Sequence, residues 1–87
     1  MSTSLPEPAQ AALIHDSGDT CGGAVTSTLT QLMAPLVAGE VLLLLNSDPA
    51  APLDLRAWAK GHGHTFLGET VHAGRPGYYI RKGGDKE

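Results

Sequence analysis

The stretch that most constrains the fold is a run of five apolar residues, Val41–Leu45, near the middle of an 87-residue chain. The run has no alternation of apolar and polar residues, which is typical of a β-strand buried on both faces of a sheet. It is far too short to span a bilayer. A chain of this length forms one small domain with one thin core. The sequence on both sides of Val41–Leu45 therefore has to supply the neighbours that bury this strand.

Two helices are predicted, one on each side of this strand. The first follows Gly22, is limited by Pro35 and is closed by Ala38 and Gly39. The second follows residues 46–49, a polar group ending in proline that is typical of a helix start, and its end is marked by two glycines. The helically spaced apolar positions are Val25, Leu29, Leu32, Met33 and Leu36 in the first helix, and Ala51, Leu55, Trp58 and Ala59 in the second.

Three further segments are predicted to be strands: residues 11–15, 65–71 and 78–82, with a turn at residues 72–77 between the last two. Because strand–helix–strand units have right-handed crossovers, both helices should lie on one face of the sheet. The predicted fold is an α/β two-layer sandwich with the order β-α-β-α-β-β.

One domain is expected at residues 10–84, with a flexible leader at 1–9 and a tail at 85–87. The first ten residues are polar and include two prolines, so they resemble neither a signal peptide nor a membrane anchor. Charge is uneven: residues 1–55 carry a net charge of −6, and residues 56–87 carry +3. This modest basic half lacks the dense basic and aromatic pattern of a nucleic-acid binder, so direct nucleic-acid binding is not favoured.

Cys21 is the single cysteine and lies where the first predicted helix begins. A helix N-terminus has unpaired N–H groups and a partial positive charge, which stabilise a thiolate or a persulfide. Cys21 is therefore a candidate nucleophile. The alternative is a small buried apolar residue, as most free cysteines are. A lone cysteine excludes an intramolecular disulfide and an all-cysteine metal site, and we expect a reducing, cytoplasmic compartment.

The predicted topology gathers further polar residues near Cys21, because the carboxyl ends of parallel strands meet at one edge of a sheet. Asp48 follows the second strand, and the turn with His72 and Arg75 follows the third strand if that strand is parallel to the first two. Arg75 is the candidate cation near Cys21; an exposed turn arginine is the alternative. The residues expected to support the site are Gly22, Gly23, Asp48, His72 and Arg75.

Other chemistries fit less well. The glycines around Cys21 lack the Lys-[Ser/Thr] ending of a phosphate-binding loop. His62 with His64, or Cys21 with His15 or His72, could be metal-ligand pairs, but no set of four ligands has the spacing of a metal site. We therefore expect neither a metal nor a cofactor.

Five short motifs occur in a fixed order and spacing. They are Gly39-Glu40-Val41-Leu42, Ser47-Asp48-Pro49, Asp54-Leu55-Arg56-Ala57-Trp58, Gly63-His64 and Tyr79-Ile80-Arg81-Lys82-Gly83-Gly84. Together they resemble the TusA/SirA-like family of small sulfur-carrier proteins over roughly residues 13–84. The resemblance implies a mixed four-stranded sheet of order 1-2-4-3, with the last strand antiparallel and both helices on one face.

In that family a cysteine at the start of the first helix, within a Cys-Pro-x-Pro motif, accepts sulfur as a persulfide. Cys21 occupies the cysteine position, whereas Gly22 and Ala24 occupy the proline positions. The resemblance implies a carrier that takes sulfur from a cysteine desulfurase or a rhodanese-like donor. It would pass the sulfur to an acceptor protein in tRNA thiolation or another sulfur relay. The alternative is a non-catalytic binding or regulatory module that keeps the fold without sulfur transfer.

Overall fold

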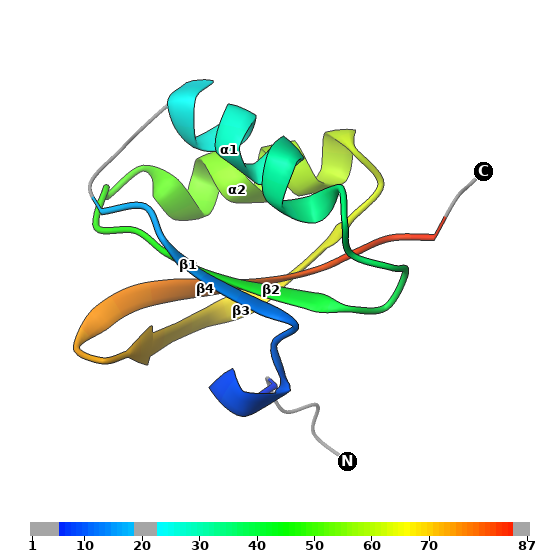
Figure 1. Ribbon diagram of the computed structural model, residues 1–87. Helices are drawn as coiled ribbons and strands as arrows, with labels where there is room; N and C mark the ends of the chain where they lie inside the picture. The colour runs from blue at the N-terminus through cyan, green and yellow to red at the C-terminus, as the bar shows by residue number, and fades with distance from the viewer. Residues whose placement is uncertain (1–5, 19–22, 85–87) are drawn as a thin grey trace, which may run out of the picture.

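The computed structural model describes residues 6–18 and 23–84. Figure 1 shows two helices packed on one side of a sheet and a short N-terminal turn on the other side. The elements in chain order are η1 (Pro8–Gln10), β1 (Leu13–Asp16), α1 (Gly23–Met33), β2 (Val41–Leu45), α2 (Ala51–Gly61), β3 (Thr65–His72) and β4 (Arg75–Arg81).

The four strands form one mixed sheet with the order β1-β2-β4-β3. β1 pairs with β2 in parallel, and β4 lies antiparallel between β2 and β3. β3 therefore runs in the same direction as β1 and β2. Both helices cover the same face of this sheet (Figure 1), so the predicted α/β fold is confirmed.

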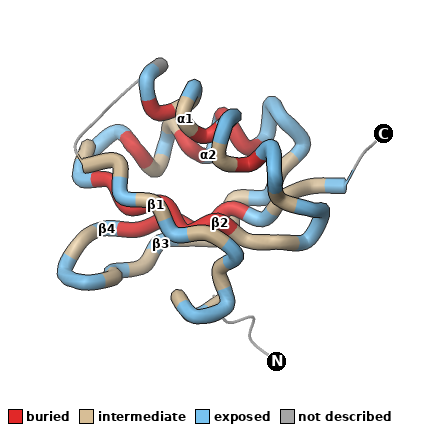
Figure 2. Tube along the Cα trace, viewed as in Figure 1, coloured by how far each residue is buried: buried red, intermediate tan, exposed pale blue. Residues whose placement is uncertain are grey.

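Strand β2 is buried on both faces, as its unbroken apolar sequence predicts (Figure 2). Leu42 and Leu44 belong to the cluster beneath the helices. Leu43 and Leu45 point to the opposite face, where they form a second cluster with Tyr79. Burial of apolar surface on both sides makes β2 the centre of the domain.

The second cluster is covered from the side opposite the helices by the N-terminal segment. Ala11 packs against this cluster, and η1 lies on the same side of the sheet (Figure 1). Burial, followed by the nearby charge of Glu7, raises the pKa of the Tyr79 phenol. The Tyr79 hydroxyl is buried without a hydrogen-bond partner among the described residues. The segment around η1 thus adds a partial third layer, while the predicted domain limits at residues 10 and 84 stay a prediction.

Helix α1 ends at Met33, three residues before the predicted end of its apolar stripe at Leu36. The cause is Pro35, which disfavours helical geometry for Ala34. The chain leaves in a turn in which the Leu36 N–H donates to the Met33 carbonyl at 3.0 Å. Leu36 still packs against the core. Neither helix within the described ranges combines the length and apolar character that a membrane crossing needs.

The prediction of a long turn at residues 72–77 is wrong. β3 extends to His72 and β4 begins at Arg75, so the turn contains only Ala73 and Gly74. Both have positive φ, +53° and +77°, as a two-residue type I′ hairpin requires. Pro76 fits within β4 because the pairing of β4 with β2 stops at Gly77, so no β2 residue needs the N–H that proline lacks.

Candidate functional site

The sheet edge at which the parallel strands β1 and β2 end is the candidate functional site. Among the predicted site residues, Cys21 and Gly22 lie outside the described residues, and Gly23 is the first residue of α1. The structure places Arg75 at this edge beside the end of β1. It places Asp48 three residues after the end of β2 and His72 at the end of β3.

Backbone hydrogen bonds continue the pairing of β1 and β2 beyond the strand ends. The Ser17 N–H donates to the Leu45 carbonyl at 2.9 Å, and the Ser47 N–H donates to the Gly18 carbonyl at 2.8 Å. The Ser17 hydroxyl donates to the same Leu45 carbonyl at 3.0 Å. The chain is therefore held in place as far as Gly18, three residues before Cys21 in the sequence.

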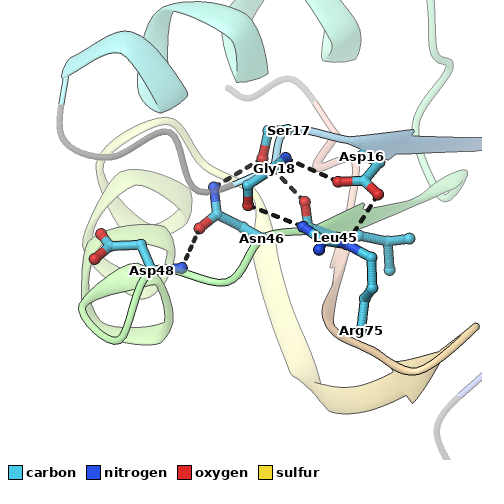
Figure 3. A network of polar contacts seen from close by, with 7 residues as sticks. All are labelled: Asp16, Ser17, Gly18, Leu45, Asn46, Asp48 and Arg75. Atoms are coloured by element: carbon cyan, nitrogen blue, oxygen red, sulfur yellow. Dashed lines mark hydrogen bonds and ion pairs between the residues drawn. The ribbon is translucent and has the colours of Figure 1, made fainter.

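Asn46 lies between the two connections that leave this edge (Figure 3). Its side chain is 0% exposed, and it is the buried polar residue of the core described here. The Asn46 Nδ2 donates to the Ser17 hydroxyl oxygen at 2.8 Å, and the Asn46 Oδ1 accepts from the Asp48 N–H at 2.7 Å. Its own N–H donates to the Pro76 carbonyl at 3.0 Å. One amide thus joins the ends of β1 and β2, and its backbone is fixed to β4.

The role of Asn46 was missed by interpreting residues 46–49 as the start of a helix. Helix α2 begins at Ala51, its N-cap Ala50 makes no side-chain cap bond, and the first-turn proline is Pro52 rather than Pro49. Asn46 instead accepts from the N–H two residues ahead, as Asn side chains commonly do in turns. The available signal was its position directly after the apolar run of β2, where a polar side chain has to be buried and paired.

Arg75 is bound on two sides at this edge. Its Nη2 donates to the Gly18 carbonyl at 3.1 Å, and its Nε lies 2.9 Å from the Asp16 Oδ2. The second contact is an ion pair by distance, without the alignment of a hydrogen bond. The other oxygen of Asp16, Oδ1, accepts from the Gly18 N–H at 2.8 Å. Gly18 has a φ of +65°, which glycine adopts without a steric cost.

The side chains of Asp48 and His72 are less constrained by hydrogen bonds and ion pairs than the side chain of Arg75. The Asp48 carboxylate is close enough to the buried Tyr78 to help raise the pKa of that phenol, after the larger effects of burial and Glu69. His72 pairs with Arg75 across the hairpin, and its imidazole makes no hydrogen bond to a described residue. Both side chains are partly exposed.

The histidines that could have formed a metal pair bond to the protein itself. The His62 Nδ1 is 2.9 Å from the Trp58 carbonyl, and the His64 Nδ1 accepts from the Gly83 N–H at 3.0 Å. Both imidazoles pack against the Trp58 indole. Within residues 6–18 and 23–84 there is no group of three or more His, Cys, Asp or Glu side chains placed to hold a metal ion.

The chain is similar to a Bacillus subtilis (strain 168) protein named "Putative sulfur carrier protein YrkF", with 42% identity over 53 residues. The match covers 61% of this chain and 29% of the relative. The chain therefore spans less than a third of the length of the curated relative that it matches. No protein-family model matches the sequence.

Proposed function

We propose that this chain is a small sulfur carrier in which Cys21 accepts sulfane sulfur as a persulfide and transfers it to a partner protein. The observation that carries the proposal is the 42% identity to YrkF over 53 residues. The donor is a cysteine desulfurase or a rhodanese-like protein. The acceptor belongs to tRNA thiolation or another sulfur relay of the cytoplasm.

The proposed transfer is a thiol exchange that balances without an oxidant or a reductant. The Cys21 thiolate attacks the outer sulfur of the donor persulfide, and a bond forms between Sγ and that sulfur. The S–S bond of the donor breaks, and the donor cysteine leaves as a thiolate with the electron pair of that bond. The hydrogen of the persulfide stays on the transferred sulfur. The acceptor thiolate then attacks the same sulfur on Cys21, and Cys21 becomes the leaving thiolate.

Two features of the fold support this chemistry. Cys21 stands two positions before Gly23, at which α1 begins, and the first turn of α1 has no acidic residue to offset its positive end. Such an end favours a thiolate or persulfide over the protonated form. In addition, Ser47 and Arg75 hold the Gly18 carbonyl at the start of the segment that carries Cys21.

The proposal is tested by incubating the protein with a cysteine desulfurase, pyridoxal phosphate and cysteine, and then measuring its intact mass. We expect a gain of one sulfur atom, localised to Cys21 by peptide mapping and removed by a reductant. The Cys21→Ser variant should gain nothing. An unchanged wild-type mass with this donor and with a rhodanese-like donor would favour the non-catalytic module.

A further inference from the structure

We infer that Asn46 is a positioning residue for the proposed sulfur transfer: its buried amide fixes the Ser17–Gly18 stem relative to the Ser47–Asp48 stem. The inference rests on the proposed function of Cys21 and adds a residue to it. Asn46 acts through Ser17 and the backbone, so it is not a catalytic residue.

Burial of the Asn46 amide has a free-energy cost. Asn46 is 0% exposed and follows four buried leucines. A polar side chain is tolerated at such a position only when its hydrogen bonds are made. The Nδ2 and Oδ1 atoms bond to two different connections, at 2.8 Å to Ser17 and at 2.7 Å to Asp48. These bonds are satisfied together in one relative placement of the two stems.

The backbone of Asn46 is itself bonded to a third strand. The Asn46 N–H donates to the Pro76 carbonyl at 3.0 Å, so its backbone is part of the sheet at the end of β4. An apolar side chain would fill the same volume but would bond to neither stem. Without the amide, the two stems would keep the backbone bonds from Ser17 to Leu45 and from Ser47 to Gly18 but would lose the side-chain bond between Asn46 and Ser17.

The Ser17–Gly18 stem leads in sequence to Cys21. The stem fixed by Asn46 ends at Gly18, whose carbonyl also accepts from Ser47 and Arg75, and Cys21 follows three residues later. A nucleophile loses up to about a hundredfold in rate when it is misplaced by about 1 Å. Loosening the Ser17–Gly18 stem should therefore change the reactivity of Cys21 more than an equal loss of stability elsewhere.

The test is the pH profile of Cys21 alkylation by iodoacetamide, which needs no sulfur donor, together with the rate of sulfur loading at saturating desulfurase. We expect Asn46→Ala to move the midpoint of alkylation upward by about one pH unit and to slow loading about tenfold. Ser17→Ala, which removes the acceptor of the amide, should move both in the same direction. The double variant should resemble Asn46→Ala, because the two residues act as one unit.

Met33→Ala is the matched control, because Met33 is buried at the far end of α1. It should lower stability and leave the alkylation profile unchanged. A wild-type profile in Asn46→Ala, or in Ser17→Ala if the first variant does not fold, would overturn the inference. An equal shift in Met33→Ala would also overturn it. If the wild type gains no sulfur but the alkylation shift is present, the proposed function fails while the role of Asn46 stands.

Discussion

The imidazole of His64 makes the stability of the fold depend on pH. Its Nδ1 accepts the Gly83 N–H, so it has to be unprotonated for this bond. Burial, the charge of Lys82 and the charge of His62, in that order, lower the pKa of His64. The unfolded chain therefore takes up this proton more readily than the folded chain.

Linkage between protonation and folding makes His64 destabilise the fold as the pH falls. The contribution of His64 to stability is complete above its unfolded-state pKa of about 6.5 and is lost as the pH falls through the lower folded-state pKa. We predict that the free energy of unfolding by urea decreases from about pH 7 to about pH 5, and that His64→Ala shows a smaller decrease. His72→Ala, which removes an imidazole far from Gly83, should keep the wild-type slope. An unchanged slope in His64→Ala would contradict the prediction.

Strand direction predicts that Arg75 lies near Cys21. The structure shows the Arg75 guanidinium in contact with Gly18, 57 residues away, while its proximity to Cys21 stays a prediction. The bond between Asn46 and Ser17, which are 29 residues apart, leaves no periodic signal. Only the fold brings these two side chains together. The placement of Cys21 itself stays a prediction, because it lies outside the described residues.

At the scale of elements, the residues just after β4 form hydrogen bonds with the ends of both helices. The Lys82 Nζ donates to the Met33 carbonyl at the end of α1, at 2.6 Å. The Gly39 N–H donates to the Lys82 carbonyl at 2.9 Å, and the Gly83 N–H reaches His64 just after α2. Lysine at a helix C-terminus also complements the negative end of the helix dipole. Residues 82 and 83 thus connect the sheet to the ends of both helices by hydrogen bonds.

This arrangement predicts different effects for two adjacent glycines. A Cβ on Gly83 would overlap the Gly63 carbonyl oxygen, whereas a Cβ on Gly84 would meet nothing. We expect Gly83→Ala to lower the free energy of unfolding by about 1–3 kcal/mol, as overpacking typically does. Gly84→Ala should stay within about 0.5 kcal/mol of wild type. Thermal and urea unfolding would measure both, and equal effects would show that the chain avoids the overlap by moving.

Element types were largely predictable from the sequence, but several element ends were not. The apolar run of β2 and the helical stripes gave the right types, because burial on one face or two imposes a period. The start of β4 was hidden by Gly74, Pro76 and Gly77, a composition that is typical of a turn. Pro76 and Gly77 are compatible with a strand here because β2 ends beside them and because Leu43 and Leu45 occupy the space above Gly77.

At the scale of the whole molecule, the sheet is covered by the helices on one face and in part by the N-terminal segment on the other (Figure 1). Removal of residues 1–11, which takes away both Glu7 and Ala11, should therefore uncover Leu43, Leu45 and Tyr79. We expect a loss of about 1–3 kcal/mol in the free energy of unfolding, the scale of one large apolar side chain. We also expect the pKa of Tyr79 to move down toward its ordinary value, because both burial and the Glu7 charge are reduced.

The measurement is an alkaline absorbance titration of the two tyrosines alongside urea unfolding. Removal of residues 1–5 alone is the matched control, because Glu7 and Ala11 are kept. Tyr78, which lies in the cluster beneath the helices, should titrate as in wild type in both variants. Identical Tyr79 titrations in the two deletions would show that the segment around η1 does not cover the phenol.

The ultraviolet absorbance of the buried Tyr79 phenol can also report binding to the protein. Its hydroxyl has no hydrogen-bond partner among the described residues, so its ultraviolet spectrum reports the polarity of its surroundings rather than a fixed bond. Any binding event that lifts the N-terminal segment would bring water to this ring and shift the spectrum. Partner engagement on that face could then be followed without attaching a dye.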